Sequence, residues 1–331
     1  MESLRQSERT AENRAPGRRA FYGLLPASIS HEGYAAKPMH SYWDDFWALK
    51  GYKEAVVIAT ALGHQEAATR LARQRDEFRD DLYASLAASI AAHGISYLPG
   101  SAELGDFDAT STTIALAPAG EQANLPQDLL LSTFERYWQA FVGRRDGGTP
   151  WDDYTPYELR TVGTFVRLGW RQRAQEVLDF FFADRRPPGW NQWAEVVGRE
   201  PRKPRFVGDM PHGWVASDFI RSALDLFAYE READGALVLA AGLPQPWLEG
   251  VGVAIENLRT PYGRLSYSLQ SQGRRLSLKV AAGMQPPPGG LVFVWPGERP
   301  PGATRLNGQP VNWQGSELRI HQLPAEVIAG D

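Results

Sequence analysis

The chain has 331 residues, a formal net charge of −4 and an isoelectric point near 5.9. Because acidic and basic residues are interspersed, no basic surface for a phosphate backbone is indicated, and we expect no nucleic-acid partner. Cysteine is absent, which excludes disulfides, thiolate metal sites and a cysteine nucleophile.

Other patterns limit location and cofactors. No apolar run reaches the roughly 20 residues that a membrane-spanning helix needs, so we expect no membrane partner. The start of the chain lacks the apolar core of a secretory signal, so the chain as given is expected to be cytoplasmic, and exported only if a longer N-terminal region carries a signal. The six histidines show no metal-ligand spacing, and we expect neither a metal nor a cofactor. Oligomeric state is not indicated.

Apolar residues recur with helical period through the first two thirds of the chain. Phe78, Leu82 and Leu86, for example, form one stripe of a long amphipathic helix. Helices are predicted at 41–62, 64–93, 127–142, 156–168, 171–182 and 212–229. Short links between them favour antiparallel helical hairpins in a toroid or a bundle.

The pattern changes near residue 232 to short alternating or β-branched runs. Strands are predicted at 236–240, 251–257, 263–269, 276–281, 291–294 and 318–321. Gln272-Gly273 and Asn307-Gly308 are typical of hairpin turns. The sequence therefore predicts a mainly α protein with two domains: a toroid of helical hairpins over 1–232, then a small antiparallel β-sandwich over 233–331.

Aromatic and acidic residues alternate in several short segments, and eleven tryptophans are a high load for this length. Sugars stack on aromatic faces and present hydroxyl groups that bond to carboxylates and imidazoles. This composition favours a carbohydrate-active protein. The candidate residues are His40, Trp43, Asp44, Asp45, Trp47, Glu103, Asp106, Asp108, Tyr157, Glu158, Trp190, Asn191, Trp193, Glu195, Asp209, His212 and Trp214.

Each candidate also has a structural interpretation. One of Asp44 and Asp45 can cap the helix that starts beside them, and Asp108 can cap a helix at 109–117. Glu195 can be a first-turn acid that the helix dipole stabilises. His212 can bond to the backbone at a helix end.

Several motifs together resemble the six-hairpin glycosidases. These are Tyr22-Gly23-Leu24-Leu25-Pro26, then Trp43-Asp44-Asp45, then Trp193-Ala194-Glu195, then Met210-Pro211-His212-Gly213-Trp214, before a β-rich tail. The superfamily includes glucoamylases, trehalases and bacterial α-L-rhamnosidases, and the rhamnosidase-like members are closest in pattern. The resemblance implies an (α/α)6 toroid and, since these helices are too few for one, a C-terminal portion or a shortened form.

The resemblance also implies roles. Glu195 aligns with the general base of an inverting hydrolysis, and Asp44 or Asp45 with the acid that holds sugar hydroxyls. His212 and Trp193 would line the same subsite. The family's general acid lies upstream of the Tyr22 motif, so in this chain Asp45, Glu103, Asp106 and Asp108 are the alternatives.

The sequence thus predicts a glycoside hydrolase that acts on oligo- or polysaccharides, with Glu195, Asp45 and Asp44 as catalytic candidates. Two alternatives remain open. The chain can be a non-catalytic carbohydrate-binding fragment of a longer glycosidase. It can also be a polysaccharide lyase, with Tyr154, Tyr157, Arg160 and His212 supplying the base and the neutralising cation.

Overall fold

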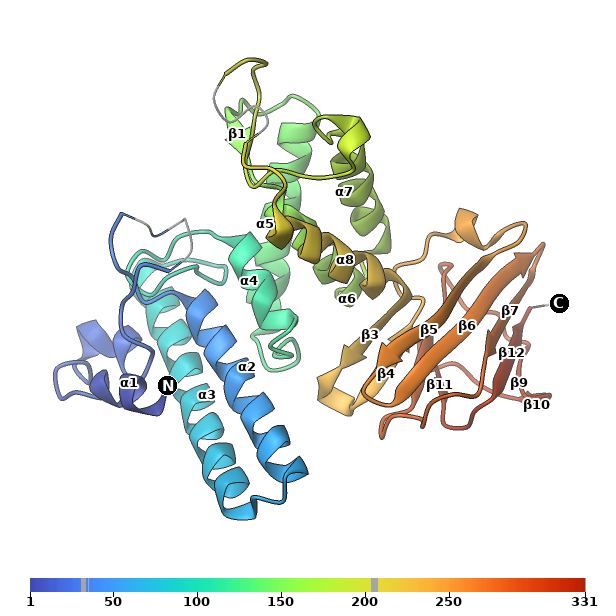
Figure 1. Cartoon of the computed structure of the whole chain (residues 1–331), viewed down its shortest axis with the longest axis horizontal. Coiled ribbons are helices and arrows are strands. Elements are labelled where there is room, and N and C mark those ends of the chain that lie inside the picture. Colours follow the sequence, from blue (N-terminus) through green and yellow to red (C-terminus); the bar gives the residue numbers. More distant parts are fainter. Residues whose placement is uncertain (31–33, 35, 204–207, 331) are drawn as a thin grey trace. The chain divides into compact units, whose positions relative to one another are not determined.

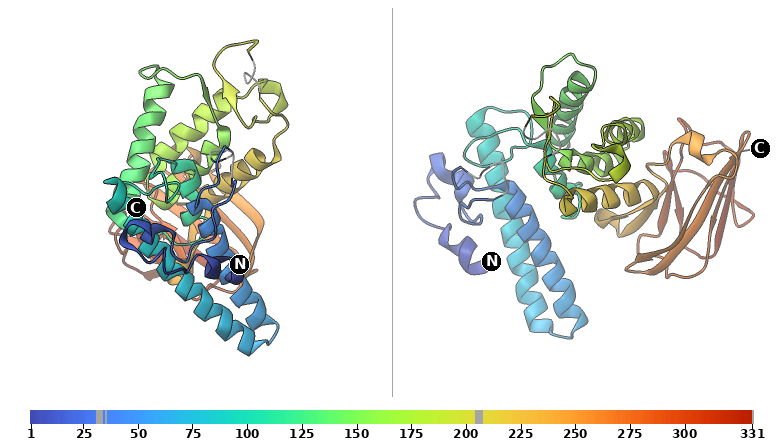
Figure 2. Two further views of the ribbon diagram at one scale, coloured as in Figure 1. Left: turned by 90° about the vertical axis from the view of Figure 1, so that its left-hand side faces the viewer. Right: turned by 45° about the horizontal axis from the view of Figure 1, so that its top comes forward.

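The computed structural model describes residues 1–30, 34, 36–203 and 208–330, and Figures 1 and 2 show the chain in three orientations. Helices hold 43% of the described residues and strands 19%, so this part of the protein is mainly helical with a smaller sheet region. The α-helices are α1 (Glu2–Ser7), α2 (Tyr42–Ala61), α3 (Gln65–His93), α4 (Ala109–Leu116), α5 (Gln127–Arg145), α6 (Arg160–Arg167), α7 (Arg171–Ala183) and α8 (Gly213–Phe227).

The strands follow mainly after α8. They are β1 (Asp153–Tyr154), β2 (Val197–Gly198), β3 (Ala228–Arg231), β4 (Ala236–Leu239), β5 (Val253–Thr260), β6 (Gly263–Gln272), β7 (Arg275–Val280), β8 (Leu291–Val294), β9 (Thr304–Leu306), β10 (Gln309–Pro310), β11 (Glu317–Ile320) and β12 (Ala325–Ala329). The predicted helices and strands all occur, with ends shifted by a few residues. Short elements without a long periodic run, such as β9 and β12, were not predicted.

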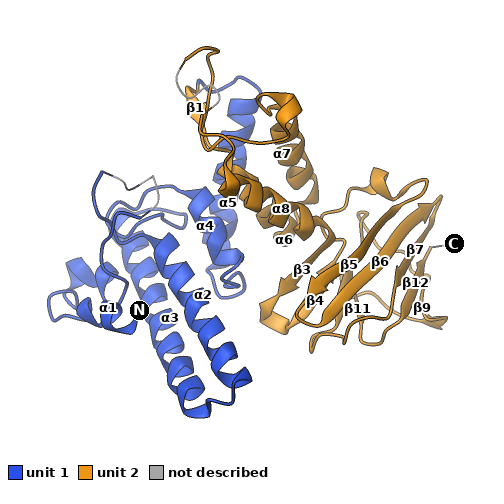
Figure 3. Cartoon of the chain, viewed as in Figure 1, with its two compact units in different colours: residues 1–150 blue, residues 151–331 orange. Residues whose placement is uncertain are grey.

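The chain divides into two compact units, unit 1 at 1–150 and unit 2 at 151–331, which Figure 3 distinguishes by colour. The predicted division at residue 232 coincides with the change from helices to strands, since α8 ends at Phe227 and strands dominate from there on. As a division between domains it stays a prediction.

Unit 1 is built on an antiparallel hairpin of α2 and α3, which lie side by side in Figures 1 and 2. Phe78 and Leu82 on α3 have no exposed surface, as the predicted apolar stripe requires. The helix ends at Gly94, whose φ of 61° is the left-handed conformation that glycine adopts at little cost.

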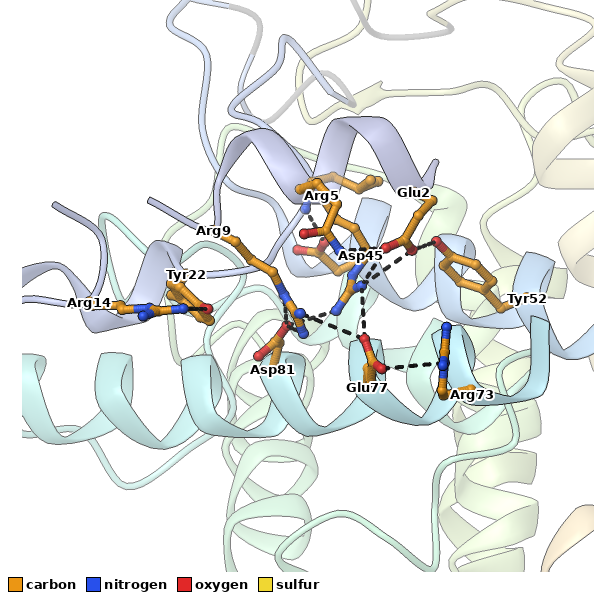
Figure 4. A network of polar contacts seen from close by, with 12 residues as sticks. Glu2, Arg5, Arg9, Arg14, Tyr22, Asp45, Tyr52, Arg73, Glu77 and Asp81 are labelled. Atoms are coloured by element: carbon orange, nitrogen blue, oxygen red, sulfur yellow. Dashed lines mark hydrogen bonds and ion pairs between the residues drawn. The ribbon is translucent and has the colours of Figure 1, made fainter. Parts of the chain in front are cut away.

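Charged residues hold the N-terminal segment against α3 (Figure 4). Arg5 is fully buried, and its Nη2 donates to Oδ2 of Asp81 at 2.8 Å. Arg9 donates to the same oxygen at 2.7 Å. Nη1 of Arg5 also pairs with Glu2 at 3.0 Å. Two guanidinium groups thus share one carboxylate, which anchors α1 and Arg9 to α3.

In unit 2 the helix α6 contacts both α7 and α8. The 3-10 helix η3 (Pro156–Leu159) precedes α6 and also contacts α8. The short strands β1 and β2 pair antiparallel, which brings residues 153–154 beside 197–198. This pairing places the segment around Glu195 next to η3.

The strands of unit 2 after α8 form two larger sheets, with the orders β10-β9-β12-β7-β6-β5 and β11-β8-β4-β3. Burial alternates along β6 and β7, as expected for a sheet with one covered face. The Asn307-Gly308 turn joins β9 to β10, and Gly273 lies in the turn from β6 to β7. The expectation of purely antiparallel pairing is corrected at one place, because β4 pairs with β8 in parallel.

Within the described part of the chain, no helix combines the length and the apolar character that crossing a membrane demands. Helical hairpins are present, as α2 with α3 and α6 with α7 show. Closure of such hairpins into a toroid stays a prediction.

Candidate functional site

Three predicted residues of unit 2 converge. One ligand atom each of Glu195, Asp209 and His212 lies within 4.8 Å of the other two. Glu195 and His212 are half-buried and Asp209 is exposed. The cluster therefore offers two carboxylates and one imidazole at the surface of the unit.

Backbone contacts bring these side chains together. The N–H of Glu195 donates to the carbonyl of Asp209 at 3.3 Å, and the hydroxyl of Thr155 donates to the carbonyl of Glu195 at 2.7 Å. Gly208 allows the approach, since a Cβ there would lie 1.9 Å from the carbonyl oxygen of Val196. A larger residue at 208 would push the two segments apart.

His212 is the N-cap of α8, where its Nδ1 accepts from the N–H of Val215 at 3.4 Å. An accepting Nδ1 leaves the hydrogen of the neutral ring on Nε2. Nε2 lies 3.4 Å from the hydroxyl of Tyr157. The helix start thus aims the Nε2 edge of His212 at Tyr157.

Aromatic rings and a cation border this pair. Tyr157 meets the ring of Trp214 edge to face at 5.8 Å, and Trp214 is 49% exposed. The guanidinium carbon of Arg160 lies 4.5 Å from the centre of the Tyr157 ring. Nε of Arg160 donates to Asp218 at 2.6 Å. The exposed face of Trp214 is the kind of surface on which a sugar ring stacks.

Asp218 fixes Arg160 in the interior. Burial raises the pKa of Asp218, and the charge of Arg160 opposes that rise. The ion pair is nearly fully buried, so the guanidinium is held against Tyr157 rather than free to turn outward. Asp218 was not among the predicted site residues. Its spacing from Val215, Ser222 and Asp225, all on the buried face of α8, would have revealed a buried acid.

The remaining candidates of unit 2 are dispersed. Trp193 is buried, packs on Phe219 at 4.9 Å and donates through Nε1 to the carbonyl of Phe181 at 2.8 Å. Trp190 is 63% exposed. Asn191, also exposed, accepts from Arg185 at 2.5 Å. Glu158 is buried beside Tyr157 in η3.

A second cluster lies in unit 1 around His40 and Glu103. Nδ1 of His40 lies 2.6 Å from Oε1 of Glu103, and the backbone N–H of His40 also donates to that carboxylate at 2.9 Å. Nε2 of His40 is 3.7 Å from Glu8. Burial by itself would lower the pKa of His40, but the hydrogen bond and charge of Glu103, together with the charges of Glu8 and Asp45, raise that pKa.

Asp45 is buried near this cluster. It is 1% exposed and accepts from the N–H of Leu25 at 3.0 Å. Burial raises its pKa to about 8, against the lowering effect of the Leu25 bond and of His40. Leu25 lies two residues after Gly23. Gly23 has a φ of 76° and no side chain, which lets Asp81 lie against its backbone. Burial therefore disfavours the ionised form of the Asp45 carboxyl group.

The other candidate acids of unit 1, which are Asp44, Asp106 and Asp108, bond to nearby backbone or hydroxyl groups. Asp44 accepts from Ser28 and Ser30. Asp106 accepts from Tyr34 at 2.7 Å and from Ser101. Asp108 caps α4 through the N–H of Ser111, as its structural interpretation predicted.

The two tryptophans of this segment differ in access. Trp43 is 7% exposed and borders a cavity of about 10 Å³, which has room for about one water molecule. Trp47 is 40% exposed, and its ring meets the ring of Trp43 edge to face at 6.0 Å. A sugar ring does not fit the cavity, so Trp47 offers the accessible face of this pair.

The predicted residues therefore fall into two groups. In the unit 2 group, Glu195, Asp209, His212 and Trp214 reach the surface, and the buried Tyr157 contacts His212 and Trp214 from below. The unit 1 group centres on buried side chains. The prediction that Glu195, Asp45 and Asp44 are catalytic stays a prediction.

Comparisons with known proteins found little. No family profile matches the chain, and no curated protein matches its sequence. A comparison of structures found an α-L-rhamnosidase from Dictyoglumus thermophilum with a TM-score of 0.41 and 10% sequence identity. The match covers 85% of this chain and 31% of that chain, so this chain spans about a third of the length of that enzyme. The relationship is a distant structural one.

Proposed function

We propose that this chain is a glycoside hydrolase of the six-hairpin type, or the part of one that carries its general base, with helical hairpins belonging to an (α/α) toroid. The observation that supports it best is the surface cluster of Glu195, Asp209 and His212 beside the exposed ring of Trp214. The site joins carboxylates for proton transfer with an aromatic face for a sugar ring.

Glu195 is the proposed base. Its half-buried carboxylate takes a proton from a water molecule while the oxygen of that water attacks the anomeric carbon. The bond from that carbon to the leaving-group oxygen breaks, and a general acid protonates this oxygen. His212, with its hydrogen on Nε2, is placed to donate to a sugar hydroxyl group or to Tyr157.

The separation of the two carboxylates bears on stereochemistry. Inverting enzymes keep their carboxyl groups about 6.5–9.5 Å apart to admit water, whereas retaining enzymes keep them about 5–5.5 Å apart. Oxygens of Glu195 and Asp209 lie within 4.8 Å, too close for the inverting arrangement. We therefore keep inversion as the proposal, with a general acid outside this cluster, and give Asp209 a binding role.

The decisive experiment compares Glu195→Gln with the unchanged chain on a panel of α- and β-glycosides. Glu200→Gln is the matched control, because Glu200 is an exposed acid of the same segment. We expect Glu195→Gln to lower turnover by about 100-fold or more and the control to leave it unchanged. Equal turnover in all three would refute the role of Glu195.

The anomeric configuration of the first product, followed by NMR, tests the stereochemistry. An inverted product supports a distant acid. A retained configuration would instead make Asp209 the partner of Glu195. Sugar binding without turnover would favour the binding-fragment alternative.

A second candidate function is a polysaccharide lyase, and one observation favours it. Tyr157 and His212 lie 3.4 Å apart with Arg160 packed over the Tyr157 ring. In a lyase the tyrosine or histidine removes the proton beside a uronate carboxylate, and a cation neutralises that carboxylate. The ion pair of Arg160 with Asp218 weighs against this role, because Asp218 already neutralises the charge of the Arg160 guanidinium group. A product with ultraviolet absorbance from a new C=C bond would identify the lyase.

A further inference from the structure

We propose that Glu195, Asp209 and His212 bind one divalent transition-metal ion of the Zn²⁺ or Mn²⁺ type. This inference goes beyond the proposed hydrolase and does not rest on it. Its basis is the donor set: two carboxylates and one imidazole whose ligand atoms lie within 4.8 Å of one another at the surface of unit 2.

The donors suit such an ion in kind. Imidazole with carboxylate favours Zn²⁺, Mn²⁺ or Fe²⁺, whereas Ca²⁺ and Mg²⁺ prefer sites made of oxygen alone. Three protein ligands also leave coordination positions open for water or a sugar hydroxyl group. The sequence analysis missed this site, because Glu195, Asp209 and His212 do not share a short metal-ligand spacing.

The distances require a modest contraction. Ligands at about 2.0–2.2 Å from a metal lie about 3–4 Å from one another, somewhat less than the 4.8 Å limit found here. Asp209 is exposed, so its side chain can turn toward an ion. The backbone bond from Glu195 to Asp209 holds the two segments at the required approach.

Two features of the site oppose the binding of a cation, and both are weaker than the attraction of the two carboxylates. The N-terminus of α8 beside His212 carries about half a positive charge, which repels a cation. Two carboxylates carry about two negative charges and outweigh it. Binding through either ring nitrogen changes the cap bond of His212 to Val215, but at 3.4 Å that bond is long and weak.

The consequence concerns Glu195. A carboxylate that coordinates a metal ion no longer accepts a proton from water freely. Occupancy of this site is therefore expected to decrease any turnover that uses Glu195 as base. This effect would make hydrolysis sensitive to Zn²⁺ or Mn²⁺ and restorable by a chelator.

The test is calorimetric titration of the metal-free full chain with ZnCl₂ and, separately, MnCl₂ and CaCl₂. We expect one equivalent of a transition metal to bind, and Glu195→Gln, Asp209→Asn and His212→Asn each to weaken binding by 10-fold or more. Asp179→Asn and His321→Asn are matched controls, since both residues are exposed in unit 2 away from the cluster. Both controls should bind as the unchanged chain does.

Three results would overturn the proposal. They are no saturable binding of either transition metal, binding that the three cluster variants retain, and binding of Ca²⁺ alone. Because the readout is heat of binding, failure here leaves the hydrolase proposal standing. Conversely, loss of the hydrolase proposal through unchanged turnover in Glu195→Gln does not affect this result.

Discussion

The hydroxyl group of Tyr157 lies 3.4 Å from Nε2 of His212, and their rings meet edge to face at 5.5 Å. The residues are 55 positions apart, Tyr157 in η3 and His212 at the start of α8. Contact between η3 and α8 makes the pair. Its chemistry separates the two functions considered for this site.

Replacement of Tyr157 by phenylalanine removes the hydroxyl group but keeps the ring against Trp214. If the chain is a hydrolase with Glu195 as base, we expect turnover to change by less than about 10-fold, because Tyr157 only positions His212. A lyase that uses Tyr157 would lose about 100-fold or more. Steady-state rates of the two proteins on the same substrate decide between these outcomes.

Removal of the Trp214 ring should weaken sugar binding. Its side chain is 49% exposed beside the cluster, and stacking on an aromatic face contributes about 1 kcal/mol. We expect Trp214→Ala to raise the dissociation constant of an oligosaccharide by about 5- to 10-fold. Trp247→Ala is the control, since Trp247 is similarly exposed, at 45%, in unit 2. Equal affinities in both variants would rule out Trp214 as a sugar platform.

The stability of unit 1 should decrease as pH rises, because ionisation of the buried Asp45 carboxyl group is unfavourable in the folded state. Burial raises its folded-state pKa to about 8, whereas an unfolded aspartate has a pKa near about 4. Between these two pH values the folded chain therefore keeps a proton on Asp45 that the unfolded chain has released. The resulting stability is complete below pH about 4 and is lost as pH rises through about 8. Hydrogen bonding to Glu103 raises the pKa of His40, so His40 acts in the same direction from pH about 6.5 upward.

The Asp45→Asn variant isolates this effect, because an amide still accepts from the N–H of Leu25. We expect its free energy of unfolding to fall less steeply between pH about 5.5 and 8 than that of the unchanged chain. The difference should be at most about 1.4 kcal/mol per pH unit. Urea unfolding at several pH values measures it. Parallel pH profiles would contradict a protonated Asp45.

The shared carboxylate of Asp81 should be important for stability. Asp81→Asn removes one of the two close carboxylate partners of the fully buried Arg5 and leaves Glu2 as the other, so we expect a cost at the low end of the about 3–5 kcal/mol that breaking a buried ion pair costs. The comparison is Arg73→Gln. Arg73 is 75% exposed and pairs with Glu77 at 3.8 Å, so its loss should cost less than about 1 kcal/mol. Chemical denaturation of both variants checks the contrast, and similar midpoints would contradict it.

The amino-acid sequence by itself determined the helices and strands with long periodic patterns. The stripe through Phe78 and Leu82 predicted α3, and Asp108 was recognised as a cap of α4, because both signals depend on residues within a few positions of one another. The short strands β9 and β12 carry too few residues for such a pattern. Their pairing depends on partners elsewhere in the sheet.

Only the tertiary structure decided which candidates share a site. It placed Trp193 in the core and Trp214 at the surface, although both lie in segments of similar aromatic and polar composition. It brought Glu195 to Asp209 through a backbone bond that Gly208 permits, and paired Arg160 with Asp218. These contacts join segments distant in sequence, and their geometry follows from the packing of whole elements rather than from local periodicity.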